Sequence, residues 1–244
     1  MWRSTFGLRF HHLHVNDDKP DALLSYYEKL FDRTTTKRSA VANFRGIEAD
    51  GVFLLITPVK EQPPEEGGAG WHFGWGSISL DEAYDQHRMR EADLKLPIPS
   101  YAHDLHVHIE SANPVAAAQW YRDRFEARIA TRQQNADVTP VNSYYRRPAA
   151  IVELQGISLA IYKAMQPLTS SRGHRIDHIA FKVDLAAARG GEFTVLEASG
   201  RLGSLETMTI EGPDKLAIEL VGPPRFQREP TARISPGAMN SMRK

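Results

Sequence analysis

The sequence predicts an α+β protein built from tandem copies of one unit, in which a strand and a helix are followed by further strands. The first observation is a histidine-opened strand pattern that occurs four times, at His12, His72, His106 and His178. Strand side chains alternate between two faces, so each histidine lies on the face opposite to the core residues. The second observation is an amphipathic helical pattern after the first and third copies. The third is a Leu-Ala-Ile phrase shared by the last strands of the third and fourth units. Such periodic similarity indicates a repeat architecture.

The first unit contains every element of the pattern. Its histidine strand, residues 11–16, is followed by Asn16-Asp17-Asp18 and Pro20, which favour the start of a helix. Apolar residues then recur at three- and four-residue spacing, as in a helix that covers a sheet. Strand-like segments complete the unit, at residues 34–37, 40–45 and 51–57.

The second unit is predicted to be truncated. Its histidine strand, residues 71–78, leads into a polar helix over residues 81–93. Pro97 and Pro99 then arrive before any further strand. A loop rich in proline and glycine, residues 61–70, separates the first two units.

The third unit is complete, whereas the fourth has a weak helix. In the third, a strand over residues 104–110 and a helix begun by Asn113-Pro114 precede several strands. In the fourth, the strand over residues 176–183 is followed by a helix that Gly190-Gly191 interrupts. Strands are then expected in two places, near residues 206–210 and 216–221.

The Leu-Ala-Ile phrase aligns the last strands of the units. Tyr162 follows the phrase in the third unit, and Glu219 follows it in the fourth. Leu216 and Ile218 are predicted to face the core, so Glu219 faces the side on which the histidines lie. The glycines before these strands place Thr57 at the same position of the first unit.

Composition excludes several classes of function. Lysine plus arginine and aspartate plus glutamate both total 30, so no global charge would recruit nucleic acid or an anionic membrane. No apolar run reaches the roughly 20 residues of a spanning helix, and the first ten residues lack the apolar part of a signal peptide. We therefore expect a cytoplasmic protein that binds a small molecule, and a homodimer stays open. The chain has no cysteine, so any metal must be held by nitrogen and oxygen atoms.

The arrangement of units, with a histidine opening and a carboxylate closing, resembles the vicinal oxygen chelate superfamily. This superfamily includes glyoxalase I, extradiol dioxygenases, and fosfomycin and bleomycin resistance proteins. The resemblance covers nearly all of residues 8–222 and is strongest at His178, at Ile210-Glu211-Gly212-Pro213-Asp214 and at Ile218-Glu219-Leu220. It implies that βαβββ units pair into cup-shaped mixed sheets, with metal ligands on the concave face.

The resemblance implies a metal site formed by His106, His178 and Glu219, with Tyr162 in the fourth position. Two neutral imidazoles and one carboxylate leave coordination sites open for a chelating substrate. Such a set suits a divalent metal, with Fe²⁺ or Mn²⁺ favoured and Zn²⁺ or Ni²⁺ as alternatives. Tyr162 is a candidate catalytic residue, because its hydroxyl could donate to an oxyanion. The units could also pair first with fourth and second with third, and His12 would then join His178 and Glu219.

The N-terminal half is expected to have lost its metal. His12 and His72 form a pair there that is analogous to His106 and His178. Thr57 is a poor ligand, however, and the truncated second unit supplies no closing carboxylate.

The expected function is that of a divalent-metal-dependent enzyme acting on a small oxygenated organic molecule. Extradiol-type dioxygenation is slightly favoured, because those enzymes resemble this chain in a site of two histidines and one glutamate. Thr209 departs from that pattern, since the dioxygenases have a tyrosine there. A glyoxalase-like isomerase or lyase is the second interpretation. The third is a metal-free ligand-binding protein similar to bleomycin resistance proteins, which would have no need of the metal ligands.

The units divide the chain into two halves and a tail. The N-terminal half spans residues 8–100 and contains the first unit and the truncated second unit. Residues 101–222 form the C-terminal half, with the expected metal site. Residues 223–244 contain four prolines and few large apolar residues, which predicts a mobile tail.

Overall fold

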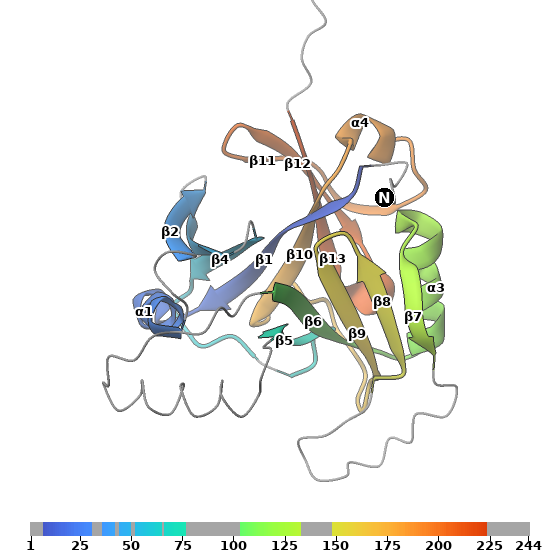
Figure 1. Cartoon of the computed structure of the whole chain (residues 1–244), viewed down its shortest axis with the longest axis horizontal. Helices are drawn as coiled ribbons and strands as arrows, with labels where there is room; N and C mark the ends of the chain where they lie inside the picture. The colour runs from blue at the N-terminus through green and yellow to red at the C-terminus, as the bar shows by residue number, and fades with distance from the viewer. Residues whose placement is uncertain are drawn as a thin grey trace, which may run out of the picture.

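The structure is a computed structural model that describes residues 7–30, 36–41, 44–49, 52–64, 66–76, 103–132 and 148–223. Strands form two mixed sheets with few helices, so the predicted α+β class is confirmed (Figure 1). The helix expected over residues 81–93 and the tail from 224 lie outside the described residues.

The larger sheet combines the first and fourth units. Its central strands, β1 (Arg9–Asp17) and β10 (Ile176–Lys182), pair in antiparallel orientation. Each is flanked by the last strand of its own unit in parallel orientation, namely β4 (Val52–Pro58) and β13 (Ala217–Gly222). The outer strands are β3 (Phe44–Ala49), β2 (Thr36–Val41), β12 (Leu205–Glu211) and β11 (Thr194–Leu202). This eight-stranded sheet has the order β11-β12-β13-β10-β1-β4-β3-β2.

The smaller sheet combines the second and third units. Strands β5 (Gly70–Gly76) and β6 (His103–Ser111) pair in antiparallel orientation, and β9 (Ile157–Lys163) runs parallel to β6. Strands β8 (Ala150–Leu154) and β7 (Arg128–Arg132) complete this five-stranded sheet. The units thus pair first with fourth and second with third. Each sheet takes strands from both sides of residue 100, so neither sheet coincides with a predicted half.

The described helices begin where local signals place them. In α3 (Pro114–Phe125), the side chain of Asn113 accepts from the backbone N–H of Ala116, and proline occupies the first turn. The helix α1 (Pro20–Leu30) likewise begins at a proline. The fourth unit has only the short α4 (Leu185–Ala188), as its glycines predict, and η1 (Pro213–Lys215) precedes β13. None of the described helices has the length and apolarity needed to cross a membrane.

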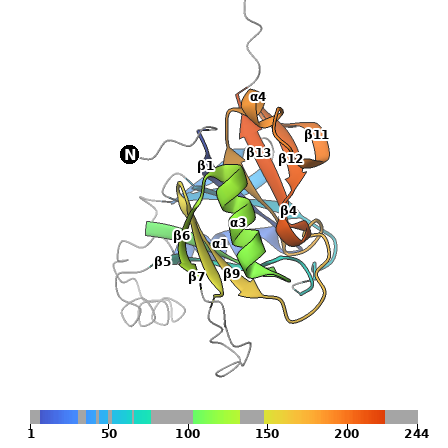
Figure 2. The same ribbon diagram turned by 90° about the vertical axis from the view of Figure 1, so that its right-hand side faces the viewer.

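The apolar faces of the two sheets share one core. Phe181 of β10 is fully buried and contacts Phe10 of β1 and Phe125 of α3, with ring centroids 5.7 Å apart in both cases. Figure 2 shows α3 lying against the five-stranded sheet, and its buried residues Tyr121 and Phe125 join that core. The histidines of the central strands lie on the faces turned away from this shared core.

Candidate metal centre

A β-bulge in β10 places two consecutive polar residues on one face of the eight-stranded sheet. The pairing of β10 with β1 shifts at Asp177. An extra residue in one strand of a pair re-aims the side chains beside it. Ile176 and Ile179 therefore both join the core, although they are three residues apart. Asp177 and His178, which lie between them, face the other side and contact each other.

Another β-bulge, which lies in β1, also re-aims the side chains beside it. The pairing shifts between Phe10 and His12, and Phe10 and Leu13 both join the core. His12 lies on the face of the sheet that carries His178. The two bulges thus bring together histidines that are 166 residues apart in the sequence.

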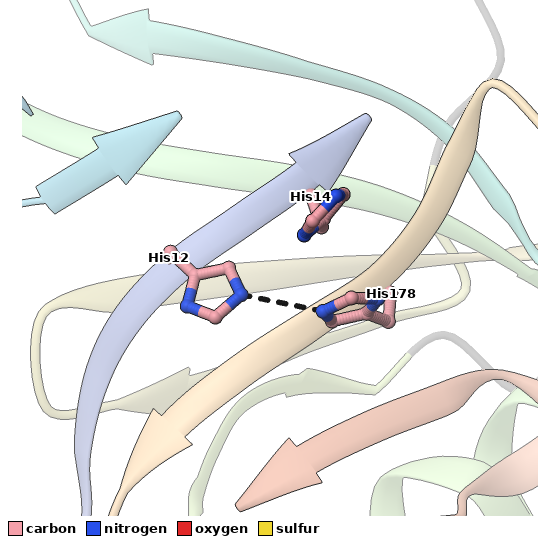
Figure 3. A group of neighbouring side chains, drawn as sticks. All are labelled: His12, His14 and His178. Carbon is pink, nitrogen blue, oxygen red and sulfur yellow. Dashed lines mark hydrogen bonds between the residues drawn. The ribbon is translucent and has the colours of Figure 1, made fainter. Parts of the chain in front are cut away.

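The three histidines on this face form a compact group, the first histidine cluster, which consists of His12, His14 and His178. Ligand nitrogen atoms of all three lie within 4.8 Å of one another, and such a group could hold a metal ion. Figure 3 shows the three imidazoles, with His12 and His14 on β1 and His178 on the neighbouring β10. The Nε2 atoms of His12 and His178 are 3.2 Å apart.

A carboxylate completes the arrangement. An oxygen of Glu219 on β13 lies 3.5 Å from Nε2 of His12 and 3.9 Å from Nε2 of His178. Glu219 reaches this place because it pairs with Ala180, two residues after His178, in the parallel register of β10 and β13. Two imidazole nitrogens and one carboxylate oxygen therefore converge on a common point.

Asp177 fixes the orientation of His178. Nδ1 of His178 donates to the Asp177 carboxylate over 2.7 Å, which leaves Nε2 available as a ligand. The same carboxylate pairs with Arg172 at 3.2 Å and accepts from the backbone N–H of Gly173 at 2.8 Å. Burial alone would raise the pKa of the Asp177 carboxyl, but the hydrogen bonds from His178 and from the backbone N–H of Gly173, together with the nearby Arg172, lower it below its usual value.

The other two histidines have partners of their own. Nδ1 of His12 lies 2.9 Å from Nδ1 of His11, so a proton on one nitrogen is shared with the other. If His12 donates, its Nε2 is free to bind a metal on the side of Glu219. Nε2 of His14 lies 2.6 Å from the hydroxyl of Thr57, at the end of β4.

Burial keeps the imidazoles of β1 neutral. It lowers the pKa of His12 well below the usual value, and the neighbouring His178, His11 and His14 lower it further. Burial and the proximity of His178 lower the pKa of His14 to about 3. Burial raises the pKa of the Glu219 carboxyl, although His178 opposes this rise. Neutral imidazoles and a carboxylate whose charge needs a counterion fit a divalent cation well.

A cavity of about 290 Å³ adjoins these residues. Its lining includes His14, His178, Glu219, Arg172, Arg201 and Glu197. This volume is at the lower end of the range for small-molecule sites. Two arginines in the lining could bind a negatively charged group of a ligand.

The structure brings together two of the predicted metal ligands and separates the third. His178 and Glu219 lie in the first cluster, whereas His106 lies on β6 of the five-stranded sheet. His12 takes the place that the sequence analysis gave to His106, as the pairing of the first with the fourth unit requires. Tyr162, the predicted catalytic residue, lies on β9 of the five-stranded sheet and does not line the cavity.

The strand register also changes which residue of the third unit corresponds to Glu219. Glu219 pairs with the residue two after His178, but Tyr162 pairs with Glu110, four residues after His106. The residue of β9 that matches Glu219 in this register is therefore Ala160.

In the first unit, too, the residue that corresponds to Glu219 lies two positions before the one that the sequence predicts. Leu55 pairs with His14, two residues after His12, and so matches Glu219. Thr57 lies two residues further along, where it contacts His14. The first unit thus contributes a buried apolar residue to the fourth position of the site.

The sequence was compared with protein families and curated proteins, and the structure with solved structures. No protein-family model matches the sequence, and no curated protein matches it. The structure of glyoxalase I from Zea mays is similar, with a TM-score of 0.61, 10% identity, and coverage of 88% of this chain and 92% of that chain. A mutant form of the same maize enzyme has a TM-score of 0.59, 10% identity, and coverage of 88% and 94%. The chain has the fold of the vicinal oxygen chelate superfamily, as its sequence resemblance predicts.

Asp177→Asn tests whether Asp177 positions His178. We expect the affinity for a divalent metal to fall by about 10- to 100-fold, because the outer partner of a metal-binding histidine sets its tautomer and orientation. Metal titration of the stripped protein measures the effect. Asp184→Asn is the control, since Asp184 caps α4 and an asparagine can cap it equally well. Equal metal affinity in Asp177→Asn and the native protein would contradict the assignment.

Proposed function

We propose that this protein is a divalent-metal-dependent enzyme that acts on a small oxygenated organic molecule, with the metal held by His12, His178 and Glu219. The carrying observation is the convergence of two Nε2 atoms and one carboxylate oxygen, with separations of 3.2, 3.5 and 3.9 Å. A bound divalent metal would supply Lewis acidity toward an oxygen of the substrate. Asp177 holds the ligand tautomer of His178, and the buried strands exclude water from one side of the site.

The cavity supports a substrate that carries a negative charge. Arg172 and Arg201 line it on the same side of the sheet as the cluster. A guanidinium can bind a carboxylate through two parallel hydrogen bonds, which would orient the substrate. His14 also lines the cavity and is held by Thr57, so its imidazole could contact the substrate.

Among reaction types, the ligand set favours dioxygenation. Two histidines and one carboxylate with open positions are typical of non-haem Fe²⁺ oxygenases. Glyoxalase-like isomerisation is the second candidate, and Glu197 favours it. This second carboxylate lines the cavity with Glu219, so it could move a proton between adjacent carbon atoms of a substrate.

The experiment begins with untagged protein that is stripped of metal and reconstituted with Fe²⁺ under argon. We expect one bound iron per chain, which His12→Ala abolishes and His106→Ala leaves in place. Turnover is then measured with a panel of catechols and of 2-hydroxy carbonyl compounds, with and without oxygen. Oxygen uptake that depends on a catechol supports dioxygenation, and oxygen-independent conversion supports isomerisation. Iron that is retained in His12→Ala and lost in His106→Ala would refute the proposed site.

A further inference from the structure

We propose that His14 is a fourth protein ligand of the divalent metal, so that three imidazoles and one carboxylate hold the ion. This inference rests on the proposed function, because it takes the ion to be bound by His12, His178 and Glu219. It adds a ligand to that set and leaves one open position fewer for the substrate.

His14 lies where a further nitrogen atom can reach the same ion. It follows His12 by two residues on β1, so both side chains point to one face of the sheet. It also pairs directly with His178 of β10. Ligand atoms of the three histidines lie within 4.8 Å of one another, and Figure 3 shows one nitrogen of His14 turned toward the gap between the other two imidazoles. The position of His14 therefore suits a ligand.

The hydrogen bond of His14 leaves one ring nitrogen for a metal, as the hydrogen bond of His178 does. Nδ1 of His178 donates to Asp177, which leaves Nε2. Nε2 of His14 lies 2.6 Å from the hydroxyl of Thr57, which leaves Nδ1. A metal-binding histidine usually donates its other ring N–H to an oxygen atom, and a threonine hydroxyl can accept such a bond. Thr57 is thus a positioning residue that selects the tautomer in which Nδ1 of His14 is a ligand.

The first unit supplies no ligand from its last strand. Leu55, the β4 residue that matches Glu219, is apolar and fully buried. His14 is the residue of β1 that pairs with Leu55. The first unit therefore contributes two ligands from its opening strand, whereas the fourth unit contributes one from its opening strand and one from its last strand.

The additional ligand changes what the site can bind. A six-coordinate ion with three protein ligands has three open positions, and with four it has two. Imidazole nitrogens suit iron, nickel and zinc, whereas manganese prefers oxygen ligands. A third imidazole therefore favours Fe²⁺ over Mn²⁺ at this site.

The test counts the bound histidines in untagged full-length protein that is stripped of metal and loaded with one equivalent of Co²⁺. A paramagnetic Co²⁺ ion shifts the N–H proton of each imidazole that binds it far outside the usual range of proton NMR, and such a signal exchanges away in heavy water. We expect three of these signals for the native chain. His14→Gln should bind cobalt more weakly and show two. His72→Gln is the control, because His72 lies on the five-stranded sheet, and it should show three.

Thr57 provides a second test of the same assignment. Thr57→Val keeps the shape of the side chain but removes the hydroxyl, so the affinity for Co²⁺ should fall by about 10- to 100-fold. Thr57→Ser keeps the hydroxyl and should retain the native affinity. An equal affinity in the valine and serine variants would show that Thr57 does not position His14.

The native signal count decides the proposal even if His14→Gln does not fold. Two shifted signals in the native chain would remove His14 from the ion and leave the proposed function intact. A native chain that binds no cobalt would instead refute the site of His12, His178 and Glu219. The two proposals therefore fail in different ways.

Discussion

Glu219→Gln is expected to abolish stoichiometric metal binding and turnover while leaving the protein folded. The amide keeps the shape of the side chain but removes the negative charge that faces Nε2 of both His12 and His178. A divalent metal held by two neutral imidazoles alone lacks the carboxylate that hard cations prefer. Iron content and substrate turnover of the reconstituted variant measure the effect.

The stability of the stripped variant separates loss of a ligand from loss of the fold. Burial raises the pKa of Glu219, which means that the folded protein without metal disfavours its ionised form. A neutral glutamine should therefore leave the stripped protein at least as stable as the native chain at pH 7. Glu197→Gln, in the same cavity, is the matched control and should keep its iron. A Glu219→Gln protein that still binds iron at the native level would remove Glu219 from the site.

Phe181→Ala is expected to lower the free energy of unfolding by about 3–5 kcal/mol, the usual cost of deleting a buried phenylalanine ring. Phe181 is fully buried and contacts Phe10 and Phe125, so its ring fills the core that the two sheets share. Urea unfolding followed by tryptophan fluorescence measures the change. Phe193→Ala is the control, because Phe193 packs at the edge of this core and is partly buried. Equal losses in the two variants would contradict the central role of Phe181.

The alternation of side chains made the fold predictable from the sequence. The histidine strands, the helix starts at Pro20 and Pro114, and the short helix before Gly190 all depend on contacts within a few residues. The pairing of units depends instead on contacts between strands such as β1 and β10, which are far apart in the chain. No local pattern in one sequence decides between two pairings that bury similar apolar faces.

The same limit explains why the fourth position of the site was misaligned. A shift of two residues along a strand leaves every side chain on its original face. The Leu-Ala-Ile phrase therefore places Tyr162 and Glu219 on equivalent faces of their sheets. It does not place them at equivalent distances from the histidines of the neighbouring strands, because Glu219 pairs two residues after His178 and Tyr162 pairs four residues after His106. Asp177 is different, because a bulge turned it toward His178, and its side chain would otherwise point to the core. An acidic residue directly before a candidate ligand histidine was the available signal.

The second and third units lie in the sequence between the first and fourth units, and this order affects how the protein folds. All strands of the five-stranded sheet come from one continuous stretch, residues 70–163, whereas the eight-stranded sheet needs residues 9–58 together with 176–222. Closing the larger loop costs more chain entropy and delays pairing. During synthesis β1 can pair with β4 early, but it must wait for β10 until residues 176–182 have been made. The first histidine cluster is therefore completed late in folding, because His178 reaches His12 only when β10 pairs with β1.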